Sequence, residues 1–168
     1  GTKMDVYAEG YEWMNHSLWP QHIDIADSRT LIGGPNCTKP YSAALLNVSA
    51  MSYGALSDNA IVALNTGAKA GGFYHNTGEG GISKFHRAPG ADIVWNVGTG
   101  YFGCRNKDGT FCPEMFKDNA RTDAVKMIEI KVSQGAKPAH GGMLPKEKIS
   151  AAIAEARGLG DGPYEDCN

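Results

Sequence analysis

The sequence has almost no net charge and no long apolar stretch. It contains 16 lysines and arginines against 18 aspartates and glutamates, for a formal net charge of −2 over 168 residues. A nucleic-acid-binding surface normally shows as a basic excess, so the composition argues against that class of partner. No apolar run approaches the roughly 18 residues of a membrane-spanning helix, and no secretory signal pattern opens the sequence. We expect a cytoplasmic protein without a nucleic-acid partner or a membrane segment.

Cysteine is scarce and widely spaced. The chain has four cysteines without a C-x-x-C pair: Cys37, Cys104, Cys112 and Cys167. This spacing gives little support to a zinc or iron–sulphur site, and a chain with 42% hydrophobic residues has little need of a disulfide framework. We therefore expect free thiols. Because His75, His86 and His140 fall on separate segments without i,i+4 spacing, we predict no metal site.

Glycine is abundant, at 22 residues, and gathers in loops without a fixed period. Such clusters mark turns, or places where the backbone approaches another group closely. Neither G-x-G-x-x-G after a strand nor G-x-x-x-x-G-K-[ST] is present in proper form. The run GAKAGG comes at the end of a predicted helix, which is the wrong context for phosphate binding. We therefore predict no phosphate loop of either kind.

Hydrophobic periodicity predicts alternating strands and helices from residue 45 onward. Residues 1–42 show an irregular pattern, in which YEWMNHSLWP could form a short helix ended by Pro20. The predicted strands are 45–51, 72–76, 92–97 and 125–133, and the predicted helices are 57–69, 113–119 and 146–158. This alternation is typical of βα units around a parallel sheet, so we predict an α/β fold.

Three polar, glycine-rich loops each follow a predicted strand: MSYGALS, NTGEGGIS and SQGAKPAHGG. In parallel α/β proteins, ligands bind at the carboxyl ends of the strands. We therefore expect these loops to meet at one functional rim.

The last predicted strand separates apolar from polar side chains. Ile128, Ile130 and Val132 share one face, whereas Glu129 and Lys131 share the other. If helices cover the apolar face, the polar face looks into a lumen or cleft. The alternative is a half-exposed strand whose polar face is solvated, and periodicity alone leaves both open.

Lys137 follows the same strand in a glycine-rich loop, which suits an anionic or electron-accepting ligand such as a flavin. The backbone of Met51, Ser52 and Tyr53, next to Gly54, would let a flat ring approach closely. Glu79 lies between two glycines and could position a substrate or take up a proton. The alternative for Glu79 is a solvated loop carboxylate.

Taken in order, MSYGALS, NTGEGGIS, GTGYFGC, KMIEIKVSQGAKPAHGGMLP and IAEARG closely resemble the FMN-binding domain of glutamate synthases. The sequence is most similar to the stand-alone, FMN-binding members of that family, in which YEWMNHS and IGGPNCTKPYSAALLN also have counterparts. The resemblance extends from about residue 11 to residue 166.

This resemblance implies a (β/α)8 TIM barrel that binds FMN. In complete glutamate synthases, 2-oxoglutarate and ammonia form 2-iminoglutarate, which reduced flavin converts to L-glutamate by hydride transfer. Electrons arrive from NADPH or ferredoxin through an iron–sulphur cluster, whose ligands are not in this chain. The implied role is glutamate biosynthesis in nitrogen metabolism.

The family motifs also imply roles for particular residues. The backbone at Met51, Ser52 and Tyr53 would line the isoalloxazine ring, and Lys131 would lie near it. Gln134 and Lys137 would contact the flavin or the oxo-acid, and Glu79 would lie at the reaction centre. The implied catalytic residues are Glu79, Gln134 and Lys137, and the implied cofactor-binding residues are Met51, Ser52, Tyr53, Lys131, Gln134 and Lys137.

The chain departs from the family pattern Q-G-A-K-P-G-E-G-G-Q-L-P. Ala139, His140 and Met143 replace the second glycine, the glutamate and the second glutamine of that pattern. Because that glutamine helps to hold the oxo-acid, Met143 leaves the substrate open between 2-oxoglutarate and a related oxo-acid.

Length is the other departure. A complete barrel needs about 250 residues, so we expect an N-terminal arm over 1–44 and the first half of the barrel, about four βα units, over 45–168. Such a fragment would be inactive alone and would self-associate through its open edges. Two alternatives are a non-catalytic scaffold or assembly module, and a flavin-barrel oxidoreductase with a different substrate.

Overall fold

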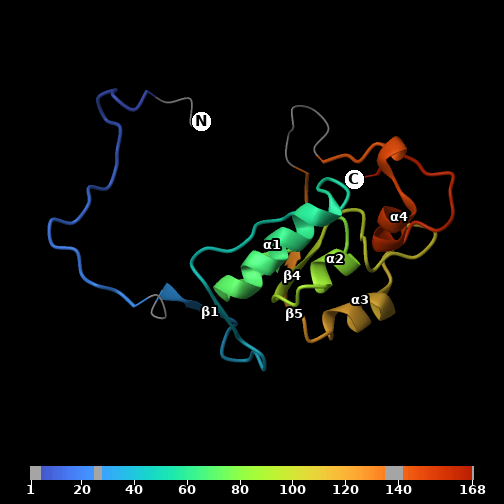
Figure 1. The fold of residues 1–168 in the computed structure, drawn as a ribbon, viewed down its shortest axis with the longest axis horizontal. Coiled ribbons are helices and arrows are strands. Elements are labelled where there is room, and N and C mark those ends of the chain that lie inside the picture. Colours follow the sequence, from blue (N-terminus) through green and yellow to red (C-terminus); the bar gives the residue numbers. More distant parts are fainter. Residues whose placement is uncertain (1–4, 25–27, 135–141, 168) are drawn as a thin grey trace.

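A computed structural model describes residues 5–24, 28–134 and 142–167, which form a mixed α/β structure (Figure 1). Its strands are β1 (Thr30–Ile32), β2 (Tyr41–Ala43), β3 (His75–Asn76), β4 (Ile93–Val97) and β5 (Val125–Ile130). Its helices are α1 (Asp58–Gly71), α2 (Lys84–Arg87), α3 (Pro113–Ala120) and α4 (Ala151–Arg157), with a short 3-10 helix at Lys146–Lys148.

The main sheet is parallel, as predicted, with strand order β3-β4-β5. All five residues of β4 are buried. This strand lies between β3 and β5, and helices pack on one of its faces. The predicted strand 45–51 is wrong in extent, since it forms only a single parallel bridge between Val48 and His75. Leu45 and Leu46, which precede the bridge, are exposed and have no packing to hold them in a longer strand.

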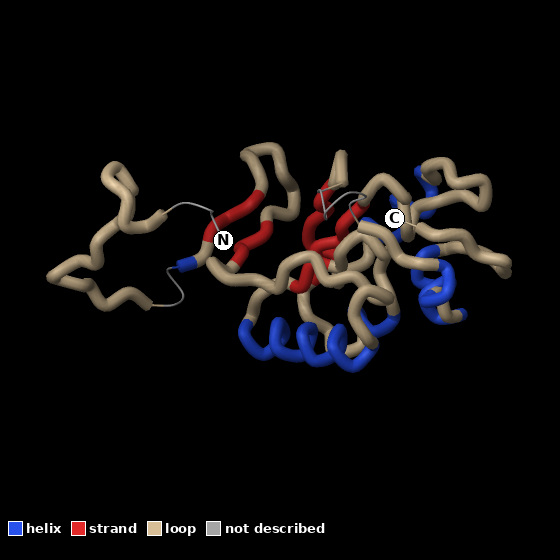
Figure 2. Tube along the Cα trace, turned by 90° about the horizontal axis from the view of Figure 1, so that it is seen from above, coloured by secondary structure: helices blue, strands red, loops and turns tan. Residues whose placement is uncertain are grey.

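Helix α1 confirms the predicted helix at 57–69. The Ser57 side chain caps it by accepting a hydrogen bond from the Ala60 amide at 3.3 Å, and Gly72 ends it. Ile61, Asn65 and Ala68 form its buried face. Figure 2 shows α1 running along one side of the sheet, so that this face packs toward the strands.

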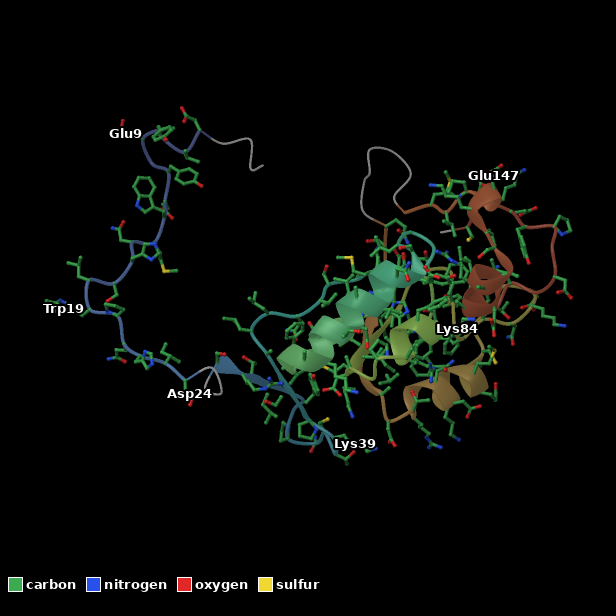
Figure 3. The ribbon with its side chains drawn as sticks, in the orientation of Figure 1. Glu9, Trp19, Asp24, Lys39, Lys84 and Glu147 are labelled. Atoms are coloured by element: carbon green, nitrogen blue, oxygen red, sulfur yellow. The ribbon has the colours of Figure 1, made fainter. Side chains whose placement is uncertain are left out.

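The predicted helix within residues 11–20 is wrong. Residues 5–24 have no helix or strand, and they extend away from the rest of the chain, with Trp19 far from the sheet (Figure 3). A helix this short is marginal in water unless its apolar face is packed, and Trp13 and Trp19 are both exposed. The rest of the region predicted as irregular contains the β1–β2 hairpin, which pairs Leu31 with Ser42. The boundary at residue 44 stays a prediction.

Three further boundaries differ from the prediction. Strand β3 begins at His75 rather than at residue 72. Strand β5 ends at Ile130 rather than at residue 133. The predicted helix 146–158 is divided, because Ser150 takes an extended conformation and caps α4 by accepting from the Ile153 amide. Helix α2 was not predicted, since four residues are too few to show a helical period.

Among the helices of the described ranges, none has the length and apolar character needed to cross a bilayer.

Two buried histidines lie next to each other, one in the sheet's edge strand and one in a helix. His75 lies in β3 and His86 in α2, with their ring centroids 5.2 Å apart. The Nδ1 atom of His75 accepts from the Asn65 amide at 3.2 Å. Burial, and then the neighbouring His86, lowers the pKa of His75 to about 4. The His75 ring is therefore neutral at pH 7.

Acid should destabilise the fold through His75. Its pKa is about 4 when folded, against about 6.5 in an unfolded chain, so the stabilisation is present above pH 6.5 and is lost as the pH falls toward 4. The shift corresponds to at most about 3 kcal/mol. We expect His75→Asn, which keeps an acceptor for Asn65, to lose less stability than wild type between about pH 7.5 and about pH 5. Urea unfolding measures this, with the exposed His16→Asn as control. Equal losses in wild type and His75→Asn would contradict it.

Candidate functional site

A cavity of about 780 Å³ lies at the carboxyl end of the parallel sheet. Its volume is in the range of small-molecule and cofactor sites. Its walls come from the segment after Val48, from the loops that follow β3 and β5, from strands β4 and β5, and from α4. Lining residues include Met51, Ser52, Glu79, Asn96, Lys131 and Met143. The described residues of the three loops predicted to share one rim therefore meet here.

Glu79 and Lys131 form an ion pair inside this cavity. The Lys131 Nζ atom donates to Glu79 Oε2 at 2.5 Å and to Gln134 Oε1 at 3.3 Å. The Gln134 amide donates to Glu79 Oε1 at 2.5 Å. The Glu79 and Lys131 side chains are only 20% and 30% exposed, and both carboxylate oxygens have a donor. Glu79 is thus held in a fixed position and is not a solvated loop carboxylate.

Strand β5 directs its polar face into the cavity. Glu129 and Lys131 both line the cavity, whereas Ile130 and Val132 on the opposite face are 70% and 85% exposed. The polar face lines the cavity, as the lumen interpretation requires, but Glu129 on that face is exposed and no described helix covers the end of the apolar face, so the end of β5 also has the character of a half-exposed strand.

Asn96 contributes an unpaired acceptor to the same cavity. Its side chain is 2% exposed, and its Nδ2 atom donates to Glu129 Oε1. Its Oδ1 atom has no hydrogen-bond partner within the part of the chain that the structure describes. A buried carbonyl oxygen without a donor costs about 1–3 kcal/mol, so this position is suited to a ligand that carries an N–H or O–H group.

Two glycines allow the loops to approach one another. Gly78 has a φ of 64°, and a Cβ atom on it would lie 2.6 Å from the Ser52 amide nitrogen. A Cβ atom on Gly98 would lie 2.6 Å from Glu79 Oε1. A side chain at residue 98 would therefore push against the Glu79 carboxylate in its place beside Lys131.

The predicted ring-binding segment divides between cavity and core. Met51 and Ser52 line the cavity. The Tyr53 side chain is buried in the apolar cluster, 4.8 Å from the Phe85 ring, and Tyr53 does not line the cavity. Lys137 and His140 lie outside the described residues. No group of three His, Cys, Asp or Glu side chains in the described ranges is arranged to hold a metal ion.

Arg157 lines the cavity and was missed by sequence reasoning. It is 4% exposed and stacks over the Phe102 ring at 4.8 Å, while its Nη1 atom lies 3.3 Å from Cys167 Sγ. No carboxylate of the described chain pairs with it, and its Nε atom has no hydrogen-bond partner. A basic residue in the last turn of a helix ordinarily indicates a favourable end charge, so nothing in the sequence pattern singles out Arg157. Its burial makes it a candidate anion-binding group.

One family model and one relative match nearly the whole chain. A family model described as "conserved region in glutamate synthase" matches residues 3–165. The "glutamate synthase large subunit-like protein YerD" of Bacillus subtilis (strain 168) is 44% identical over 166 residues, which cover 98% of this chain and 30% of that protein.

More distant relatives match a shorter part. An "archaeal-type glutamate synthase [NADPH]" of Thermotoga sp. (strain RQ2) is 38% identical over 65% of this chain and 19% of its own length. A "glutamate synthase large subunit-like protein" of Rhizobium meliloti (strain 1021) is 35% identical over 81% of this chain and 28% of its own. The chain thus spans less than a third of the length of these relatives. No solved structure matches it.

The contact between Gly98 and Glu79 leads to a test of the site's packing. We expect Gly98→Ala to lower the free energy of unfolding by about 1–3 kcal/mol, because the new methyl group must displace the Glu79 carboxylate from Lys131. The matched control is Gly67→Ala in α1, where a Cβ atom meets nothing within 4 Å. That change should stabilise the helix by about 0.5–1 kcal/mol. Urea unfolding measures both, and an unaffected Gly98→Ala protein would mean that Glu79 is not held as described.

Proposed function

The chain belongs to the glutamate synthase family, and from this premise we propose that it forms part of an FMN-dependent oxidoreductase that makes L-glutamate from 2-oxoglutarate. The observation that carries the proposal is the cavity lined by the ion pair of Glu79 and Lys131, to both of which Gln134 is hydrogen-bonded. The chain covers less than a third of its relatives, so the activity belongs to a larger protein.

We propose that the sheet is the first part of a (β/α)8 barrel. Parallel strands, helices along one side and a cavity at the carboxyl ends are the features that such a barrel repeats around its axis. The single bridge at Val48 would be the start of the first strand. The division into an arm over 1–44 and a barrel segment over 45–168 belongs to the same proposal.

The residues of the cavity fit a flavin ring. The pyrimidine edge of the ring presents an N–H group next to a carbonyl group, and thus needs an acceptor beside a donor. Asn96 Oδ1 is a buried acceptor without a partner, and Lys131 supplies a cation that stabilises the negative charge of a reduced ring. The backbone of Met51 and Ser52 gives the ring a wall.

The other charged groups suit an oxo-acid. Arg157 is a buried cation without a carboxylate partner in the described chain, so it would bind a carboxylate of the substrate. Glu79 would accept a hydrogen bond from the nitrogen of 2-iminoglutarate and orient its imine carbon, while Gln134 holds Glu79 in place. FMN, when bound, would supply the hydride that reduces that carbon.

The source of electrons is also a proposal. The name of the Thermotoga relative specifies NADPH, and we propose NADPH as the donor for the larger protein. An iron–sulphur cluster would lie between NADPH and FMN, with ligands from outside this chain.

Met143 favours a second candidate function. This apolar side chain lines the cavity, where the family pattern has a glutamine that helps to hold the oxo-acid. A related enzyme that reduces the imine of an oxo-acid with an apolar tail would use the same flavin and the same Arg157. The scaffold alternative would need neither.

Binding of FMN tests the ring site. We expect the chain to bind FMN with a perturbed visible spectrum, and Lys131→Met to bind it about tenfold to a hundredfold more weakly, because a charge-assisted contact is lost. The matched control is Lys126→Met, an exposed lysine near the other end of β5 that lies 3.8 Å from Asp92. The measurement is a titration followed by absorbance and fluorescence, with unfolding midpoints as a check on folding. Failure of wild type to bind would contradict a ring site in this chain.

Binding of oxo-acids separates the two candidate functions. With FMN bound, 2-oxoglutarate should perturb the flavin spectrum, and Arg157→Met should abolish this effect without abolishing flavin binding. If 2-oxobutyrate, which lacks the second carboxylate, perturbs the spectrum at lower concentration than 2-oxoglutarate, the second candidate is favoured. If neither acid has an effect while FMN binds, the oxo-acid role of Arg157 is wrong.

A further inference from the structure

We propose that His86 is a positioning residue that fixes the Met51 carbonyl, and with it the wall of the flavin site. This inference rests on the proposed function, because its consequence is the geometry of a bound ring. His86 itself is completely buried and does not line the cavity. It acts from behind the wall, through a hydrogen bond of 2.9 Å between its Nε2 atom and Met51 O.

The hydrogen bonds of His86 determine which ring nitrogen carries the proton. The Ser83 backbone N–H lies 3.2 Å from Nδ1, and a backbone N–H can only donate. The Ser83 hydroxyl lies 2.8 Å from the same nitrogen. Nδ1 is therefore the acceptor and carries no proton, so Nε2 carries it and donates to Met51 O. The ring is neutral, and both of its nitrogens are satisfied.

Burial supports this protonation state. It lowers the pKa of His86 below the usual value, an effect that the bond to Met51 partly opposes. A second proton would have to be placed on Nδ1, where it would face the two Ser83 donors. Burial also keeps the neighbouring His75 ring neutral. Neither ring therefore carries a positive charge that would repel the other.

The bond to His86 completes the anchoring of Met51. On its other side, the Met51 amide donates to Asn76 O in β3 at 3.2 Å. Both polar groups of the residue are therefore occupied within the protein. The next residue, Ser52, rests against Gly78. His86 thus joins the wall to the loop that carries Glu79, since Ser83 ends that loop and His86 follows in α2.

A wall held in this way is preorganised for a flat ring. Loops that must be ordered on binding lose affinity in proportion to the freedom they give up. Holding the Met51 carbonyl in one orientation before a ring arrives removes that loss. We therefore expect His86 to affect the affinity for FMN through Met51, in addition to its effect on stability through the cap of α2.

Two substitutions separate the two contacts of His86. In His86→Gln, the side-chain amide nitrogen takes the place of Nε2 and can still donate to Met51 O. In His86→Asn, the shorter side chain keeps an acceptor near Ser83 and thus the helix cap, but it cannot reach Met51. If His86 serves only the helix cap, His86→Asn should preserve FMN binding better than His86→Gln. If His86 positions Met51, His86→Gln should preserve FMN binding better.

The experiment is an FMN titration of wild type, His86→Gln and His86→Asn, with the spectrum of the bound flavin as a second readout. We expect His86→Gln to bind within about threefold of wild type with the same spectrum, and His86→Asn to bind about tenfold more weakly with an altered spectrum. Equal binding and spectra for wild type and His86→Asn would overturn the inference while leaving the proposed function intact. If wild type does not bind FMN, both fall.

A measurement on wild type covers the case in which neither variant folds. The ¹⁵N chemical shifts of the His86 ring distinguish a protonated Nε2 from a protonated Nδ1. A proton on Nε2 at neutral pH, with the slow exchange of a buried hydrogen bond, is the expected result. A proton on Nδ1 would overturn the inference, because His86 could then no longer donate to Met51.

Discussion

The ion pair between Glu79 and Lys131 is the interaction on which the arrangement of the site depends. It joins the loop after β3 to the end of β5, across the central strand β4. A carboxylate or an ammonium group left alone at this depth would lose solvation without compensation, so each requires the other. Three other features surround this pair: Gly98 leaves room for the Glu79 carboxylate, Gln134 bonds to both charged groups, and Lys131 extends from the end of β5 into the cavity.

The parts of the fold that depend on local chemistry could be predicted from the sequence. Helix α1 has a serine cap and a helical period, α3 begins at a proline, and β4 is a short run that is apolar at every position except Asn96. The parts that depend on distant contacts could not. The segment at 45–51 has the composition of a strand but pairs only at Val48, and the tryptophans of 11–20 have no surface to pack against. Their conformation is decided by packing, which periodicity does not encode.

The candidate site divides in the same way. Glu79, Lys131 and Gln134 stand out in the sequence because they lie in or next to glycine-rich loops at strand ends, and the structure brings them together. Arg157 lies in an ordinary amphipathic helix, and only its burial without a carboxylate partner in the described chain distinguishes it. Asn96 is one of five consecutive buried residues in a strand, so its unpaired oxygen is visible only in three dimensions.

The distribution of the three tryptophans gives the protein two separate optical reporters. Trp13 and Trp19 are exposed in the N-terminal segment, whereas Trp95 is completely buried in β4, 5.4 Å from the Phe116 ring. Emission from the first two reports on what that segment touches, and emission from the third reports on the integrity of the sheet. Contact of the segment with any apolar surface would shift the emission to shorter wavelength without a change in the core. Loss of the core would shift only the contribution of Trp95, to longer wavelength.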